Sequence, residues 1–280
     1  MGVLPPDNHV HSEWSWDALA GSMERTCRRA AELGLPAVAF TEHADFTPWT
    51  LSPRVELPRR WRDLVTDGVL TPPPPDVTGY LECLERCRKR HSGLRIISGV
   101  ELGEPHWHQE QAAELLESGK IERVLASLHS APAADGRGFI EVSRRYDGRP
   151  PGDVVRAYLA EIERLIEQFP RFEILAHIDY PIRYWPAEAK PYDPRDFEEE
   201  YRHVLRLLAA AGKALEVNTR LPLHPRILAW WRQEGGRSIT FASDAHKPDA
   251  LARGFREACV IASAAGFREG ADPLDFWRRD

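Results

Sequence analysis

The sequence predicts an α/β protein built as a closed barrel of parallel strands. Seven short, apolar, β-rich segments recur along the chain, and helical patterns separate most of them. Six of the seven segments end in His, Glu or Asp. Strands that alternate with helices are typical of parallel βαβ units. Seven such units favour a closed barrel over an open sheet.

The expected strands differ in the strength of their signal. The first is weak and leads into the run Asn8-His9-Val10-His11. The other six are runs of Val, Ile, Leu, Ala and Phe of ordinary strand length. They cover residues 37–40, 94–100, 124–128, 172–176, 214–217 and 239–242.

The expected helices have apolar residues recurring at helical spacing. Glycines follow three of them, at Gly34, Gly212 and Gly266, and a glycine just past the last periodic residue is a C-cap signal. The predicted helices span residues 24–33, 79–91, 154–169, 197–211 and 250–265.

Two long segments interrupt the alternation. Residues 44–75 include Thr71 followed by four prolines, which excludes a regular helix or a central strand there. We interpret this segment as a stiff surface insertion and not as a linker, because the βα pattern resumes at once. Residues 130–152 form a second long loop. Both follow strands that end in histidine, so both are expected to wall a pocket within one domain of residues 1–280.

Composition excludes several classes of protein. Hydrophobic residues make up 42% of the 280 residues and charged residues 29%, as in ordinary soluble proteins. The net charge of -6 argues against binding of extended nucleic acid. No apolar run approaches the roughly 18 residues of a membrane span, and the first residues lack the features of a signal peptide. We therefore expect a cytoplasmic protein.

The strand ends carry the chemistry. The carboxyl ends of all strands meet on one face of a parallel barrel. His9 and His11 alternate, so both imidazoles lie on one face of a strand, and Asp244 and His246 repeat this spacing. Glu101 ends an apolar strand, and its buried charge needs either a metal ion or a salt bridge to an arginine. Together these residues predict a site for divalent metal ions.

The order of these motifs resembles the PHP (polymerase and histidinol phosphatase) family. The motifs are HxH, Thr-Glu-His, Glu, Ser-Leu-His, Ala-His-Ile-Asp and Ser-Asp-Ala-His, and the resemblance runs from about residue 8 to residue 268. It implies a distorted (β/α)7 barrel with two to three divalent ions (zinc, manganese or iron) at the carboxyl ends of the strands. The implied ligands are His9, His11, Asp17, His43, Glu101, His129, His177, Asp244 and His246.

The resemblance also implies how these ligands are shared. One ion would use His9, His11, Glu101 and Asp244. A second would use Glu101, His129 and His177, and a third Asp17, His43 and His246. Three carboxylates against three divalent ions leave a positive site, which suits a phosphate-monoester dianion. Glu101, Asp244 and His246 are the residues that we expect to act most directly in catalysis.

Within the family, the chain is most similar to the histidinol-phosphatase branch. Asp17, the run Leu-Glu-Val-Asn-Thr and the run Ser-Asp-Ala-His-Lys-Pro carry this likeness. It implies hydrolysis of L-histidinol phosphate to L-histidinol and phosphate in histidine biosynthesis. Guanidinium groups suit bidentate contact with phosphate. We therefore expect Arg183, Arg220 and Asn218, which lie near strand ends, to bind this small phosphorylated substrate.

Three other functions stay open at this point. A PHP phosphoesterase for nucleotides or short oligonucleotides would need stacking aromatic side chains. An amidohydrolase-type deaminase would need eight βα units, and often a carbamylated lysine at a strand end. A non-catalytic metal-binding module would have lost ligands, whereas every ligand position is filled here. The aromatic residues near strand ends are Trp14, Trp16, Trp49, Trp107 and Tyr184.

Overall fold

The computed structural model describes residues 3–52, 55–117 and 119–279, and it confirms the predicted barrel. Seven parallel strands follow the order β1-β2-β6-β7-β10-β11-β12, and pairing of β1 with β12 closes the ring. The strands are β1 (Asp7–Val10), β2 (Ala37–Asp45), β6 (Arg95–Gly103), β7 (Arg123–Ser127), β10 (Ile174–Leu175), β11 (Ala214–Asn218) and β12 (Ser238–Ala242).

Two strands run further than the sequence predicts. β2 and β6 each have nine residues and pair along their whole length. Their register sets His43 directly opposite Glu101. The strands continue to Asp45 and Gly103, beyond the predicted ends at His43 and Glu101. His43 and Glu101 are therefore strand residues, which gives both side chains a rigid backbone.

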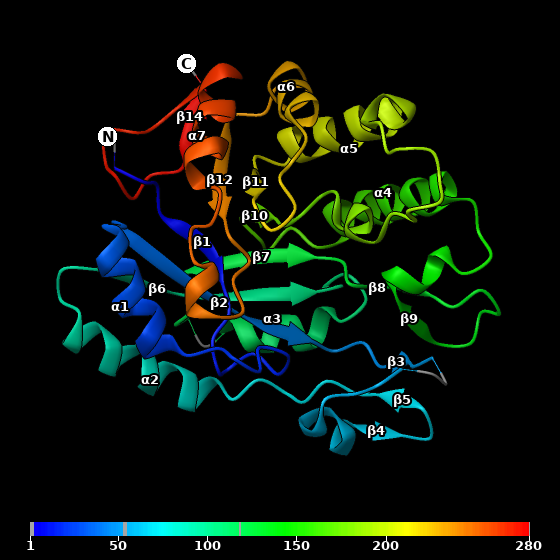
Figure 1. Ribbon diagram of the computed structural model, residues 1–280, viewed down its shortest axis with the longest axis horizontal. Helices are drawn as coiled ribbons and strands as arrows, with labels where there is room; N and C mark the ends of the chain where they lie inside the picture. Colours follow the sequence, from blue (N-terminus) through cyan, green and yellow to red (C-terminus); the bar gives the residue numbers. More distant parts are fainter. Residues whose placement is uncertain (1–2, 53–54, 118, 280) are drawn as a thin grey trace.

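Helices surround the barrel (Figure 1), and Gly34 ends the first one in the left-handed conformation expected of a C-cap. Two of them, α3 and α6, are missing from the sequence prediction. Both have only nine residues, so their periodic signal is short. The helices are α1 (Met23–Leu33), α2 (Val77–Arg90), α3 (Gln109–Glu117), α4 (Pro151–Gln168), α5 (Glu198–Ala210), α6 (Pro225–Gln233) and α7 (Phe255–Ala264).

Helix α7 also begins five residues after the predicted start at residue 250. Ala250 ends the short helical turn η5 (Pro248–Ala250), and Gly254 adopts a left-handed conformation before the helix. The other short turns are η1 (Arg59–Leu64), η2 (Val142–Tyr146), η3 (Tyr180–Tyr184) and η4 (Pro194–Phe197).

The two long insertions pair with each other in a second sheet. Within residues 44–75, three short strands form that the sequence analysis does not predict. They join two strands from residues 130–152 in the order β4-β5-β3-β9-β8. The strands are β3 (Trp49–Thr50), β4 (Val65–Thr66), β5 (Val69–Leu70), β8 (Ser130–Pro132) and β9 (Phe139–Glu141). The proline run itself lies outside helices and strands, as expected.

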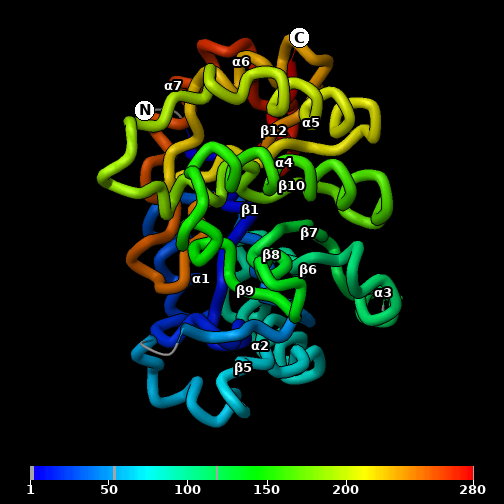
Figure 2. The backbone as a smooth tube through the Cα atoms, turned by 90° about the vertical axis from the view of Figure 1, so that its right-hand side faces the viewer, coloured from blue at the N-terminus to red at the C-terminus, as the bar shows by residue number. Residues whose placement is uncertain are grey.

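This second sheet lies on the side toward which the arrows of β2, β6 and β7 point in Figure 1. Figure 2 looks onto that side, where β8 and β9 lie in front of the barrel strands β6 and β7. Two contacts join the insertions: β3 pairs with β9 at Trp49 and Phe139, and Arg144 donates to the carbonyl oxygen of Thr50 (2.6 Å). The insertions therefore build a wall at the carboxyl ends of the strands.

Side chains of β2 alternate between two parts of the core. Val38 and Phe40 belong to the large apolar cluster beneath the helices. Ala37 and Ala39 lie in a small separate cluster with Ile97, against which Leu274 packs. A strand points successive side chains to opposite faces. The hairpin of β13 (Phe267–Arg268) and β14 (Trp277–Arg279) extends the sheet beyond β12.

No helix in the described parts of the chain combines the length and the apolar character that crossing a membrane requires.

Candidate metal centre

Strand β1 and the loop after β12 bring four of the predicted ligands together. His9 and His11 are fully buried, and their Nε2 atoms lie 3.0 Å apart. The backbone N–H of His11 donates to the carbonyl oxygen of Ala245 (2.9 Å). This bond draws Asp244 and His246 toward the end of β1, with Asp244 Oδ1 at 3.7 Å from His11 Nε2.

Glu101 lies at the centre of the histidines. Its Oε2 is 3.0 Å from His9 Nε2 and 3.2 Å from His43 Nδ1. Its Oε1 is 2.8 Å from His177 Nε2 and 3.2 Å from His129 Nε2. Burial alone would raise the pKa of Glu101, but the surrounding imidazoles outweigh it and hold the pKa well below its usual range. His11 Nε2 also lies 3.4 Å from Oε2, so Glu101 is an ionised carboxylate that five imidazoles share.

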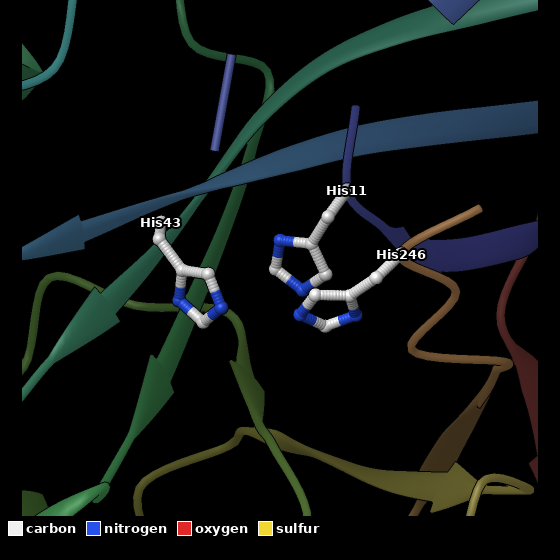
Figure 3. Close-up of side chains that lie close together, drawn as sticks. All are labelled: His11, His43 and His246. Atoms are coloured by element: carbon white, nitrogen blue, oxygen red, sulfur yellow. The ribbon is translucent and has the colours of Figure 1, made fainter. Parts of the chain in front are cut away.

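Asp17, His43 and His246 form the outer part of the cluster. Asp17 Oδ2 lies 3.4 Å from His43 Nε2 and 3.0 Å from His246 Nε2. The side chains of Asp17 and His246 are each 21% exposed, so this part of the centre meets the solvent. Figure 3 shows His11, His43 and His246 turned toward one another from separate segments of the chain. Asp17, His43 and His246 are the three residues that the resemblance implies as ligands of a third ion.

The donor set fits divalent cations. Four overlapping groups of three residues each offer ligand atoms within 4.8 Å of one another. They are His9-His11-Asp244, Glu101-His129-His177, His11-His43-His246 and His43-Asp45-His129. Buried Asp17 Oδ1, His43 Nδ1 and His177 Nδ1 have no hydrogen-bond partner among the described residues.

Two of the histidines are held neutral. Burial lowers the pKa of His11, and the neighbouring His43 and His246 lower it further. Burial lowers the pKa of His177 to about 4. A neutral imidazole has a free lone pair, which is the form that binds a metal ion. His11 and His177 are therefore in the form that metal binding requires, whereas nearby carboxylates raise the pKa of His9, His43 and His129 despite their burial.

Strained backbone supports two of the predicted ligands. Asp244 has φ 52° and His177 has φ 21°, a region that residues other than glycine seldom adopt. The Asp244 N–H donates to the carbonyl oxygen of His9 (2.9 Å), and the His177 N–H donates to Glu216 Oε1 (3.0 Å). Such strain persists where surrounding contacts impose it, and it is common at functional sites.

Glu216 is a functional residue that our prediction of the site omits. Its side chain is buried inside the barrel, and its Oε2 accepts a hydrogen bond from His9 Nδ1 (2.7 Å). This bond fixes the tautomer of His9 and leaves Nε2 free to face Glu101. The sequence contains a signal for this role of Glu216. It lies in an apolar strand two residues before Asn218, so the two side chains lie on one face of the strand.

Asp45 is a second residue that our prediction of the site omits, although its spacing in the sequence points to it. It stands two residues after His43, which repeats the i, i+2 spacing used to identify Asp244 and His246. Its carboxylate lies 3.3 Å from His129 Nδ1 and 3.5 Å from His43 Nδ1, and it accepts a hydrogen bond from Trp16 Nε1 (2.9 Å). Asp45 therefore contacts two of the histidines from the cavity side.

Two further buried acids support the ligands indirectly. Glu42 accepts hydrogen bonds from the Ser12 backbone (3.0 Å) and from Ser15 Oγ (2.6 Å). Ser15 Oγ in turn lies 3.0 Å from His11 Nδ1. Glu104 accepts from the backbone N–H groups of His129 (2.5 Å) and Ser130 (2.7 Å).

The three residues predicted to bind substrate lie in different environments. Arg183 donates to Asp244 Oδ2 (2.6 Å), and Arg220 donates to Asp244 Oδ1 (3.1 Å). Both arginines line the cavity described below. Asn218 is only 1% exposed; it donates to Glu216 Oε1 (2.8 Å) and accepts from the Arg220 backbone (2.8 Å). The side chain of Asn218 is held by these two bonds, and it is not among the residues that line the cavity.

A cavity of about 390 Å³ opens onto the cluster. Its floor includes Glu101, His177 and Asp244, and its sides come from the two insertions, as the sequence predicts. This volume lies within the usual range for small-molecule sites.

Comparison with known proteins identifies the family and the fold. The PHP domain family matches residues 7–220. The chain is 27% identical to a histidinol-phosphatase of Lactococcus lactis over 279 residues, which cover 94% of this chain and 92% of that protein. A protein of Thermotoga maritima named "Probable histidinol-phosphatase" is 37% identical over 121 residues, which cover 40% of this chain and 49% of that protein.

A solved structure shows the same fold. It is the crystal structure of the Lactococcus lactis histidinol phosphate phosphatase complexed with zinc, L-histidinol and phosphate. The two structures have a TM-score of 0.80 at 23% sequence identity, and the match covers 98% of this chain and 99% of that one. Since the family match spans more than half of the sequence and includes the histidine and acid cluster up to residue 220, this chain belongs to the PHP domain family.

Proposed function

We propose that this chain is a metal-dependent phosphatase that hydrolyses L-histidinol phosphate to L-histidinol and phosphate. The observation that carries the proposal is that the nine predicted ligands lie close together, and that seven of them line one cavity together with two arginines. The likeness to histidinol-phosphatases over nearly the whole chain supports the choice of substrate.

The predicted ligand set would hold two to three divalent ions. Zinc suits the imidazole-rich donors, and the related Lactococcus enzyme was solved with zinc, while mixed nitrogen and oxygen ligands also suit manganese or iron. When bound, such ions supply positive charge for the phosphate oxygens and make a water molecule more acidic. The proposed ligands are His9, His11, Asp17, His43, Glu101, His129, His177, Asp244 and His246.

Arg183 and Arg220 are proposed to bind the phosphate group. Both guanidinium groups contact the carboxylate of Asp244, so both lie beside a proposed metal ligand at the cavity surface. Arg183 is mostly buried, at 13% side-chain exposure, and its charge is little screened by solvent. Arg220 is half-exposed and lies at the cavity entrance. Together they offer planar donors to a phosphate ester from two sides.

Glu101, Asp244 and His246 are proposed to act nearest the reacting phosphorus. Arg220 Nη1 contacts both Asp244 Oδ1 (3.1 Å) and His246 Nδ1 (3.2 Å), so a phosphate bound by Arg220 would lie beside this pair. His246 Nδ1 also lies 3.0 Å from the carbonyl oxygen of Asp244, a contact that orients Nε2 toward Asp17. Glu101 would position the histidines around the same point.

Asn218 is proposed to position the site without touching substrate. Its side chain links Glu216, which orients His9, with the backbone of Arg220. It therefore couples the base of the metal centre to the arginine that binds phosphate. The partner of the site would be a small phosphorylated metabolite, and we expect the reaction to take place in the cytoplasm.

The test is turnover of purified protein loaded separately with zinc, manganese or iron. The substrate panel holds L-histidinol phosphate, nucleoside monophosphates, a short oligonucleotide and p-nitrophenyl phosphate. We expect kcat/KM for L-histidinol phosphate to exceed the others by at least about tenfold, the discrimination that one or two extra contacts provide. Preference for nucleotides or oligonucleotides would instead support a nucleotide phosphoesterase. If the protein binds metal ions but hydrolyses none of these esters, the result would instead support a non-catalytic metal-binding module.

A further inference from the structure

One side of the cavity is aromatic and comes from segments distant in sequence. Trp49 lies on β3 and Trp61 on η1, both in the first insertion, and Trp16 lies in the loop after β1. The ring centroids of Trp16 and Trp49 are 5.6 Å apart, and those of Trp16 and Trp61 are 5.1 Å apart. All three rings are half-buried and line the cavity.

Contacts with the rest of the site hold this aromatic side in place. Trp16 Nε1 donates to Asp45 Oδ2 (2.9 Å), and Asp45 also contacts His43 and His129. Trp49 Nε1 donates to Ser130 Oγ on β8, which ties the two insertions together. Trp16 is also next to the predicted ligand Asp17 in the sequence. The aromatic side is therefore built onto the metal centre and is not a separate surface.

Charged side chains of both signs line the cavity. Arg183 and Arg220 lie beside Asp244, where the phosphate is proposed to bind. Glu141, on β9 of the second sheet, lines the same cavity, and Ser143 Oγ donates to its carboxylate. Arg144 lines the cavity as well, and Glu141 lies close to Tyr184, the residue after Arg183. A ligand with an anionic end and a cationic end would therefore find side chains of opposite charge within one cavity.

We propose that Trp16 and Trp61 stack against the alcohol part of the substrate, and that this aromatic side, with Glu141, selects phosphate monoesters whose alcohol carries a flat, cationic ring or an amine. This inference rests on the proposed phosphatase function and names the residues that would distinguish one ester from another. L-Histidinol has both an imidazole and an amine, so its phosphate ester has the required distribution of charge.

The physical reason is the charge distribution of aromatic rings. The face of an indole is negative, and it attracts a cation above it, more strongly where water is excluded. A flat ring gains additional contact area against half-buried indoles. A neutral, flexible alcohol such as glycerol gains neither interaction. The aromatic side would therefore contribute to binding of the alcohol and leave binding of the phosphate to the arginines.

The test compares Trp61→Ala and Trp61→Phe with the unchanged protein on three esters. L-Histidinol phosphate has a cationic alcohol, p-nitrophenyl phosphate a flat neutral one, and glycerol phosphate no ring. We expect Trp61→Ala to raise KM for L-histidinol phosphate about tenfold, which is the size of a cation–π contact in a partly desolvated site. KM for glycerol phosphate should change by less than about twofold, and Trp61→Phe should restore most of the loss.

Binding of the product L-histidinol to metal-free protein gives a readout that needs no turnover. We expect it to quench tryptophan fluorescence in the unchanged protein and to bind about tenfold more weakly to Trp61→Ala. Trp277→Ala is the matched control, because Trp277 lies on β14, where it packs against Phe241 outside the cavity. The control should bind L-histidinol like the unchanged protein.

The outcomes separate this inference from the proposed function. Equal changes of KM for all three esters in Trp61→Ala, or no change for any, would overturn the selection by aromatic stacking. A larger loss for p-nitrophenyl phosphate than for L-histidinol phosphate would overturn the preference for a cation. If the unchanged protein hydrolyses no ester yet binds L-histidinol through Trp61, the proposed function fails and the aromatic site stands.

Discussion

Arg183 and Asp244 form a largely buried ion pair at the base of the cavity. Arg183 Nη2 lies 2.6 Å from Asp244 Oδ2, and the two side chains are 13% and 4% exposed. Burial alone would raise the pKa of Asp244, but Arg183 and the nearby imidazoles hold it well below its usual range. The pair joins η3, which follows β10, to the end of β12. A charge shared between a proposed phosphate-binding residue and a proposed metal ligand links the two parts of the site.

Arg183→Met should lower kcat/KM for every phosphate ester by about a hundredfold or more, because it removes a buried phosphate donor and the closer of the two arginines that pair with Asp244. Steady-state kinetics on L-histidinol phosphate and p-nitrophenyl phosphate measure this effect. Arg195→Met is the matched control, since Arg195 is exposed and paired with Asp193 on the surface. Loss of activity on only one ester would assign Arg183 to the alcohol and not to the phosphate.

Arg220→Ala should raise KM by about tenfold while leaving the metal content unchanged. Arg220 is 49% exposed, so its removal leaves solvent and not an unpaired buried charge. Elemental analysis of the purified variant, beside its kinetics, measures both quantities. An unchanged KM would remove Arg220 from the phosphate site, and a loss of metal would give it a structural role at Asp244.

His11→Ala and Asp244→Asn should abolish phosphatase activity while the fold persists. Each change removes a ligand from the innermost group, whereas the apolar core beneath the helices stays intact. Circular dichroism tests the fold, and elemental analysis tests the metal content. His203→Ala serves as control, because His203 lies on α5 and pairs with Glu163 at the surface. Full activity of either site variant would contradict the proposed centre.

Glu216→Gln should weaken metal affinity by about 10- to 100-fold, the usual cost of losing a carboxylate that orients a ligating histidine. The amide can donate to His9 Nδ1, which would favour the wrong tautomer and protonate Nε2. Competition with a chelator measures the change in affinity. Glu234→Gln is a suitable control, because Glu234 pairs with Arg202 and Arg206 away from the cavity. Equal affinity in the Glu216 variant would show that His9 does not depend on this bond.

Chelation of the bound ions should lower Tm by roughly 5–10 °C, because ions that bind only the folded chain stabilise it. Without them, the crowded imidazoles and the unpartnered atoms of Asp17 and His43 stay buried. Thermal unfolding before and after chelation, followed by reloading with zinc, measures the shift. In His11→Ala the same treatment should have a smaller effect. An identical Tm with and without chelator would argue against ions at this cluster.

The sequence was sufficient to predict the barrel and its strand order along the chain. The run that contains Val38 and Phe40, like the equivalent runs elsewhere in the chain, is apolar and as long as a strand. Helical patterns recur between these runs. Local periodicity of this kind does not depend on distant contacts. Short elements were harder to predict: α3 and α6 have too few turns for a clear pattern. The strands of the second sheet are two or three residues long and exist because the two insertions pair with each other.

The spacing of His9 with His11 identified two side chains that meet, because alternation along a strand is a local property. Asp244 and His246 lie beyond β12, and Asp244 has φ 52°, so the expected strand alternation does not hold for this pair. Only the tertiary structure decided that Glu101 lies opposite His43, since their pairing depends on the register between β2 and β6. It likewise decided that Glu216 orients His9 across 207 positions and that Asn218 is not among the residues that line the cavity. Residue types and spacings specify which groups can bind a cation, whereas closure of the barrel determines which of them meet.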